Sequence, residues 1–195
     1  MISIAKVVLI SCLSWKVLCE REPSIVYKMK NIECITIPGF SANASCFIKA
    51  INWNKAVAEM DVDLVRPLYN ISVRLQVFKK DYSNQFQPFL IDVHINICDI
   101  LSRRSFGSFG VMMLRVTKRF SNFNHSCPYE GHLFARGFYI DETLIPASPP
   151  LGFYKFNITI MENYLKTPAA HVGGIVWHAQ IMQPVKKKIK QATNG

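Results

Sequence analysis

Apolar and polar residues alternate along several segments of this chain, and this period of two restricts its fold most. In residues 89–98, the apolar side chains of Val93, Ile95 and Ile97 are separated by polar ones. Residues 58–65 alternate in the same way between apolar side chains and, mostly, carboxylates. Successive side chains of a strand point to opposite faces, so both segments predict strands with one buried face.

Six further segments have the composition of strands. They are residues 25–35, 45–53, 70–80, 132–140, 152–162 and 172–182. Pro67 marks a turn between two of the strands. Half of the residues are hydrophobic, which disfavours disorder and provides for a core. Eight short strands separated by turns predict a mainly β chain, folded as a two-sheet antiparallel β-sandwich.

Residues 106–121 break this pattern, because their apolar side chains recur at helical spacing. The spaced residues are Phe106, Phe109, Met112, Met113, Val116 and Phe120. The segment predicts one amphipathic helix in a crossover between strands. Two interpretations stay open. The helix either packs into the core or forms a flexible lid over an apolar cavity, since methionine adapts to irregular shapes.

The first residues have the layout of a signal peptide. Lys6 gives a short positive segment, and a mostly apolar run from Val7 to Trp15 follows. This run is too short to span a bilayer, and we expect cleavage near Cys19. The expected organisation is a signal peptide at 1–19, a single domain at 20–183 and a basic disordered tail at 184–195. We expect a secreted, extracellular protein that does not span a membrane.

Four of the six cysteines would remain in the secreted chain: Cys34, Cys46, Cys98 and Cys127. An even number in an oxidising compartment indicates disulfides. Four cysteines allow three pairings. We favour Cys34–Cys46 and Cys98–Cys127, because each pair closes a short local segment. No C-x-x-C spacing is present, so a zinc site is disfavoured.

Residues 124–129 combine a glycosylation acceptor, a cysteine and a proline. Asn124 fits the acceptor rule for a secreted protein, as do Asn43, Asn70 and Asn157. The proline after Cys127 disfavours a helical conformation for that cysteine. Asn157 alternates with apolar neighbours, so we expect it to point to solvent while Phe156 points inward.

The sequence contains no motif that indicates an enzyme. The five histidines are scattered, and no zinc-protease, serine-hydrolase, P-loop or dinucleotide motif occurs. His125 lies near Cys127, but a cysteine in a disulfide cannot act as a nucleophile. Glu59, Asp61 and Asp63 share a strand face and could hold calcium, although such a face is more often simply solvated. We expect no catalytic residue, metal or cofactor.

The net charge is +10, and a lysine run lies near the end of the chain. Its members are Lys186, Lys187, Lys188 and Lys190. The run is either a solvated tail or a segment that binds an anionic lipid or sulfated surface. No aromatic residue separates the lysines, and with the signal peptide this argues against nucleic-acid binding.

Five blocks of the sequence resemble the signatures of a large insect family of small secreted proteins of unknown function. The blocks are residues 31–34, 46–50, 92–98, 122–129 and 149–154. That family is similar to the chemosensory B proteins of fly taste hairs. More distantly it resembles the ML lipid-recognition superfamily, which includes the lysosomal ganglioside activator. The resemblance implies an immunoglobulin-like β-sandwich that can hold a lipid between its sheets.

Two functions follow from these observations. The first is a secreted carrier that binds a small apolar ligand, such as a lipid or a pheromone-like hydrocarbon. The second is a secreted interaction module with a filled core that acts on a receptor or the extracellular matrix. For the carrier, the expected ligand-lining residues are Phe78, Val93, Ile95, Phe109, Met112, Met113, Val116, Phe134, Phe156 and Val176.

Overall fold

The computed structural model describes residues 25–103, 107–141, 144 and 149–185. The expected signal peptide and the lysine run lie outside these residues. The described chain contains eight strands and two helices, which are β1 (Val26–Thr36), β2 (Ser41–Ala50), β3 (Ala56–Leu64), β4 (Ile71–Lys80), β5 (Phe86–Asn96), α2 (Ile97–Arg103), α3 (Ser108–Phe120), β6 (His132–Phe138), β7 (Gly152–Glu162) and β8 (Ala170–Met182).

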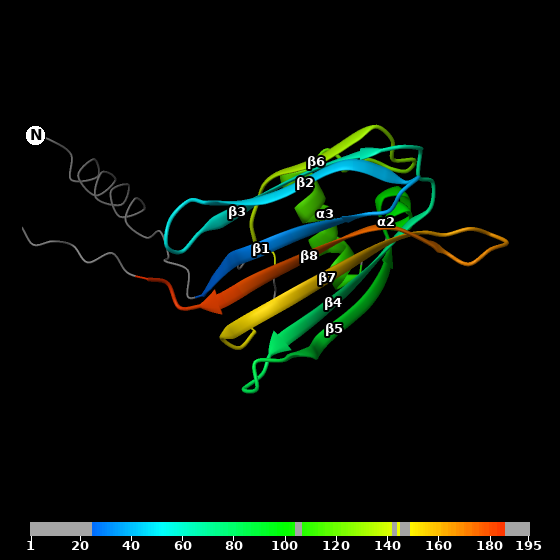
Figure 1. The fold of residues 1–195 in the computed structure, drawn as a ribbon. Helices are drawn as coiled ribbons and strands as arrows, with labels where there is room; N and C mark the ends of the chain where they lie inside the picture. Colours follow the sequence, from blue (N-terminus) through cyan, green and yellow to red (C-terminus); the bar gives the residue numbers. More distant parts are fainter. Residues whose placement is uncertain (1–24, 104–106, 142–143, 145–148, 186–195) are drawn as a thin grey trace, which may run out of the picture.

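The strands form two antiparallel sheets, which confirms the predicted two-sheet sandwich. The large sheet has the order β1-β8-β7-β4-β5, and the small sheet has the order β2-β3-β6. Figure 1 shows the large sheet in front, with the small sheet above it and α3 behind it. All strand pairs are antiparallel. Because successive side chains of a strand point to opposite faces, every second residue faces the space between the sheets.

Aromatic side chains fill one half of the space between the sheets. Tyr154 and Phe156 point inward from β7, and the Phe156 ring stacks on Trp177 of β8 with ring centroids 5.0 Å apart. Phe138 of the small sheet meets Trp177 edge-on at 6.0 Å. As expected, Asn157 points to the outer face, where its amide donates a hydrogen bond to Gln76. The predicted inward and outward assignment of β7 is therefore confirmed.

The region between β5 and β6 differs from the prediction. We expected Ile97 and Cys98 to end a strand, but both lie in the short helix α2. The side chain of Asn96 accepts a hydrogen bond from the Asp99 amide at 3.0 Å, which is the geometry of a helix N-cap. The predicted helix at 106–121 is present as α3, with Lys118 and Arg119 in its last turn. Of the two helices in the described residues, the helical spacing of the sequence predicts α3 but not α2.

Both predicted disulfides are present. Cys34 of β1 pairs with Cys46 of β2, with 5.8 Å between their Cα atoms, and so joins the two sheets. Cys98 of α2 pairs with Cys127, which lies in the segment before β6, with a Cα separation of 5.5 Å. The second bridge closes the chain around α3.

Removing either bridge should destabilise the fold. The bridges span 12 and 29 residues, and chain entropy then predicts losses of about 3 and about 4 kcal/mol in the free energy of unfolding. Urea unfolding of Cys34→Ser/Cys46→Ser and Cys98→Ser/Cys127→Ser proteins measures both. A loss below about 1 kcal/mol for the longer loop would contradict the entropic account.

Candidate ligand pocket

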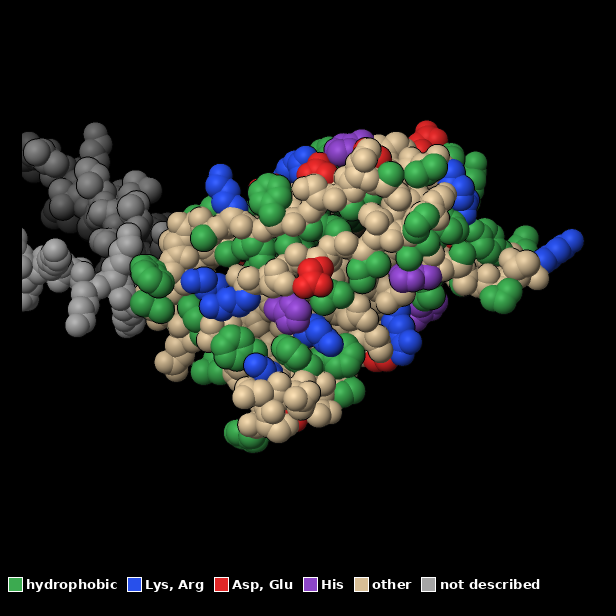
Figure 2. Space-filling model, viewed as in Figure 1, with side chains coloured by type: hydrophobic (Ala, Val, Ile, Leu, Met, Phe, Trp, Pro, Cys, Tyr) green, Lys and Arg blue, Asp and Glu red, His purple; other side chains and the backbone are tan. Residues whose placement is uncertain are grey.

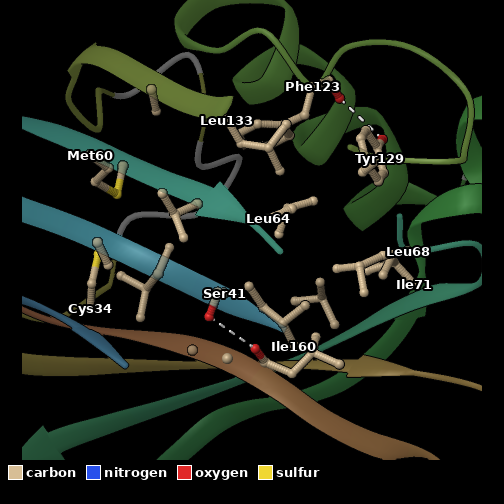
Figure 3. A pocket seen from close by; sticks show the side chains of 18 of the residues that line it. Cys34, Ser41, Met60, Leu64, Leu68, Ile71, Phe123, Tyr129, Leu133 and Ile160 are labelled. Atoms are coloured by element: carbon tan, nitrogen blue, oxygen red, sulfur yellow. Dashed lines mark hydrogen bonds between the residues drawn. The ribbon is translucent and has the colours of Figure 1, made fainter. Parts of the chain in front are cut away.

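A cavity of about 200 Å³ lies between the sheets, in the half that the aromatic core does not fill. It lies near the end of β3, the start of β4, the end of β7 and the start of β8. Figure 3 shows Leu64, Leu133 and Ile160 surrounding this space from the two sheets, with Leu68 and Ile71 beside them. These shorter side chains leave open a volume that aromatic rings occupy in the other half.

The cavity wall is mostly apolar. Its residues are Cys34, Ile35, Thr36, Ser41, Ala44, Met60, Asp61, Val62, Leu64, Leu68, Ile71, Val73, Ile97, Met113, Thr117, Phe123, Tyr129, Leu133, Phe134, Ala135, Ile160, Val172, Gly173, Gly174 and Ile175. They come from both sheets, from α2 and α3 and from the segment before β6. The site is therefore a partly open pocket between the sheets, to which most of the fold contributes.

The main polar side chains of the wall already have protein partners. The Tyr129 hydroxyl donates to the carbonyls of Phe123 and His125, at 3.2 and 2.9 Å. Burial raises the pKa of Tyr129 to about 12, so this hydroxyl stays protonated. Thr117 donates to the Leu114 carbonyl at 3.1 Å. These groups are satisfied, and an occupant would meet mainly hydrocarbon.

Glycine brings β8 close to its neighbours at the cavity wall. A Cβ on Gly174 would lie 2.8 Å from the Ile158 carbonyl oxygen, and one on Gly173 would lie 3.0 Å from that of Ile35. Both separations are shorter than ordinary contacts. Gly173 pairs with Ile160 of β7, so β8 adds no side chain to the inner face at that level. The missing side chain contributes to the open volume.

The structure separates the ten residues expected to line a ligand site. Met113 and Phe134 belong to the wall, although the Phe134 ring also contacts the Arg136 guanidinium at 5.0 Å. Phe78 and Val176 lie on the outer face of the large sheet, because each pairs in register with outward residues. The cavity-lining prediction is therefore wrong for these two. Five of the expected residues pack in the core and do not line the cavity: Val93, Ile95, Met112, Val116 and Phe156. The side chain of Phe109 lies outside the described part of the chain.

An ion pair between the buried Glu162 and the partly exposed Arg66 lies at the cavity end. The Glu162 side chain is 2% exposed, and its carboxylate lies 2.6 Å from the Arg66 guanidinium. The same carboxylate accepts hydrogen bonds from the Tyr164 hydroxyl at 2.5 Å and the Tyr69 amide at 3.0 Å. Arg66 also stacks on the Phe40 ring at 4.5 Å. This cluster ties the end of β7 to the β3–β4 connection and, through Phe40, to the β1–β2 connection.

The carboxylates considered for calcium instead pair with cations. Asp61 binds the Arg136 guanidinium at 2.5 Å, and the two ring nitrogens of His132 lie 2.8 Å from Asp63 and 3.1 Å from Asp61. The hydrogen bond with Asp63 raises the pKa of His132 above its ordinary value. Glu59 accepts a hydrogen bond from the Gly137 amide. Within the described residues, no group of three potential ligands is arranged for a metal ion.

The motif at 124–129 covers one side of the cavity. Asn124 is exposed, and the peptide bond between Cys127 and Pro128 is cis. Tyr129 is 4% exposed and pairs through both backbone hydrogen bonds with Leu68, at 2.9 Å each. The His125 ring packs on Tyr129, with centroids 5.0 Å apart. The motif thus contains both Tyr129, a buried residue of the cavity wall, and Asn124, which is exposed to solvent.

The fold and the cavity define a disulfide-linked β-sandwich with an internal apolar site. Residues 73–156 match the model of a family described as "Protein of unknown function (DUF1091)". The matched segment runs from β4 into β7 and includes the Cys98–Cys127 bridge. No curated protein matches the chain. No helix in the described ranges is long and apolar enough to cross a membrane.

Substituting Glu162 should destabilise the cavity end. Burial raises the pKa of Glu162, but hydrogen bonds from Tyr164 and the Tyr69 amide, together with Arg66, lower it below the ordinary value. The ionised form therefore stabilises the fold above the unfolded pKa, and this contribution is lost as the pH falls through the folded pKa. Glu162→Gln should lower the free energy of unfolding at neutral pH by about 2–3 kcal/mol.

Urea unfolding between pH 7 and pH 3 measures this effect, and Asp92→Asn is the matched control. Asp92 pairs with Arg74, but both side chains are about half exposed. Exposed pairs contribute little to stability. Stability of the Glu162→Gln protein should depend less on pH than that of the wild type. Equal effects of the two substitutions at neutral pH would contradict the buried ion pair.

Proposed function

We propose that this chain is a secreted module that binds a small apolar molecule in the space between its two sheets. The observation that carries the proposal is the partly open apolar cavity of about 200 Å³, which is lined by both sheets and α3. Unfilled space in a protein core costs stability, because the wall loses its packing contacts. An occupant with matching surface would recover those contacts.

The volume limits the occupant to a small molecule or part of one. An engineered apolar cavity of about 150 Å³ holds benzene, and pockets for larger ligands start at about 300 Å³. The cavity here lies between these values. It suits a single substituted ring or a short hydrocarbon chain. A complete lipid with two acyl chains would need the sheets to separate further.

The chemistry of the wall favours hydrocarbon over polar ligands. Tyr129 and Thr117 already donate to backbone carbonyls, so a polar ligand would lose its own hydration without gaining a new partner. Methionine from both α3 and β3 gives the wall some adaptability, through Met113 and Met60. We infer that the pocket selects its ligand by size and shape and not through a charged side chain that binds the ligand. The likeness to chemosensory B proteins and to the ML superfamily supports the same class of ligand.

Secretion is supported by the two disulfides, because such bridges persist in oxidising compartments. Three acceptor asparagines lie at exposed positions: Asn43, Asn70 and Asn124. Asn157 instead is only partly exposed and lies within β7, between β4 and β8 of the large sheet. Glycopeptide mapping of protein secreted by insect cells should find glycans at the exposed asparagines and little or none at Asn157. Full occupancy of Asn157 would contradict this ranking.

Filling the cavity should abolish ligand uptake. Val62 lines the cavity from β3, so Val62→Phe would place a ring in the open volume. Toluene is the probe, and methyl NMR signals of Ile71 and Leu133 report on its binding. We expect shifts in the wild type and at least tenfold weaker binding in Val62→Phe. The matched control is Val65→Phe, at a valine that is exposed just beyond β3.

Native mass spectrometry of the secreted wild-type protein tests the same proposal without a chosen probe. A co-purified apolar molecule, absent from Val62→Phe, is the expected result. If toluene shifts no wall methyl group and no molecule co-purifies, the carrier proposal fails. The alternative of an interaction module without a ligand would then be preferred. Circular dichroism of each variant establishes that the fold is retained.

A further inference from the structure

Exposed apolar side chains gather at the end of the sandwich opposite the cavity. The strand registers bring together the start of β1 and the end of β8, and the end of β4 and the start of β5. The loop between β2 and β3 lies at the same end (Figure 1). We call this region the basic-aromatic end. Its exposed apolar residues are Ile51, Trp53, Tyr82, Leu151, Phe153 and Val185.

Three of these residues are aromatic and come from different parts of the chain: the β2–β3 loop, the β4–β5 turn and the start of β7. Trp53 is 75% exposed, Tyr82 is fully exposed, and Phe153 is 46% exposed. Single exposed apolar residues are common on protein surfaces, but several on neighbouring loops indicate an interaction site. Tryptophan and tyrosine in particular prefer the interface between a membrane and water. The loops therefore present the side-chain types that suit a bilayer surface.

Lysines accompany the exposed aromatic residues. The ammonium group of Lys28 lies 5.8 Å from the Trp53 ring centroid, and that of Lys80 lies 5.9 Å from Phe153. Lys55 and Lys79 lie over other rings at the same end. None of these four lysines forms an ion pair with a described residue. They add positive charge to this end of the sandwich, where Figure 2 shows blue side chains beside green ones.

One acidic residue lies in the β4–β5 turn, directly after Lys79 and Lys80 in the sequence. Asp81 of the β4–β5 turn accepts hydrogen bonds from the backbone of Ser83 and Gln85, at 2.9 Å each, and from Gln87. The Ser83 hydrogen bond, among others, holds the pKa of Asp81 below its ordinary value. Its ionised carboxylate shapes the turn and offsets one of the lysine charges at this end.

The chain also leaves the described structure at this end. Val185 exchanges two hydrogen bonds with the Asn54 side chain, at 2.8 and 3.1 Å, and so lies against the β2–β3 loop. Four lysines follow within the next five positions of the sequence, which are 186–190. The positive charge of the folded surface is therefore continuous in sequence with the lysine run.

We propose that the basic-aromatic end docks on an anionic lipid bilayer. Trp53, Tyr82 and Phe153 would enter the headgroup region, and the lysines would face anionic headgroups. A sulfated glycan would use the lysines but would leave the exposed aromatic rings in water. A bilayer satisfies both features, since apolar burial and charge attraction add at its surface. This function is separate from the pocket, which lies at the opposite end.

Vesicle flotation of the full chain tests the proposal. The vesicles contain phosphatidylcholine alone or with added phosphatidylserine. We expect binding to the anionic vesicles that weakens as salt is added. Lys79→Gln/Lys80→Gln should weaken partitioning about 25-fold, at about fivefold per lysine. Trp53→Ser/Phe153→Ser should also weaken it, because it removes the apolar contribution.

The matched control is Leu165→Ser/Lys166→Gln, which changes the same side-chain types at the tip of the β7–β8 hairpin. Both residues are exposed, and this tip lies at the cavity end. The control and Val62→Phe should bind vesicles like the wild type, so the result is independent of the pocket. A chain ending at Val185 should retain part of the binding.

Four outcomes would overturn the proposal. The first is equal binding to both kinds of vesicle. The second is an equal loss of binding in the control variant. The third is complete loss on removal of residues 186–195 with no effect of the Lys79/Lys80 change. The fourth is retention on heparin without binding to vesicles, which would assign the surface to anionic glycans.

Discussion

The packing of Trp177 against both sheets is the contact on which the rest of the structure depends. Packed sheets lie about 10 Å apart, and this gap must be filled by side chains. Trp177 stacks on Phe156 within the large sheet and meets Phe138 of the small sheet edge-on. Its indole N–H is buried and has no hydrogen-bond partner among the described residues. Such a group costs about 1–3 kcal/mol, so ring packing outweighs that loss here.

The cavity is a consequence of this uneven filling. Aromatic rings hold the sheets apart in one half, and the two β-sheets are continuous into the other half. There the inner positions carry Leu68, Ile71, Val73 and Val172, which are shorter than the rings. A sheet cannot bend sharply enough within a few residues to close the gap. The space remains open because these side chains are too short to fill the gap between the sheets.

Much of the fold was predictable because alternation fixes both the strand and its faces. The parity of β7 follows directly from the sequence around Asn157, and the local cysteine pairs follow from loop length. The same rule shows why two expected lining residues were misplaced. Gln76 has the same parity as Phe78, and His178 and Gln180 have the same parity as Val176. These polar residues mark the outer face, so the sequence itself indicates that Phe78 and Val176 point away from the space between the sheets.

Other features have weaker signals or none. Helix α2 has only seven residues, too few for a helical period, and its best signal is the N-cap side chain of Asn96. The Glu162–Arg66 pair joins residues 96 positions apart, and no local pattern reports such a contact. The cavity depends on the combined volume of side chains from both sheets and two helices. The volume of the cavity can therefore be found only once the three-dimensional arrangement of these side chains is known. The alternation of apolar and polar residues does not give that arrangement.

The energetics of the cavity end explain why cross-links are concentrated there. Packing contacts are lost along the wall of a pocket, so this end of the sandwich gains less stability from packing than the aromatic half. The Cys98–Cys127 bridge contributes about 4 kcal/mol on the chain-entropy account, and the Glu162 carboxylate adds its hydrogen bonds and its ion pair with Arg66. Whole domains are stable by only about 5–15 kcal/mol. Contributions of this size hold the two sheets and α2 in place where the side-chain packing between them is incomplete.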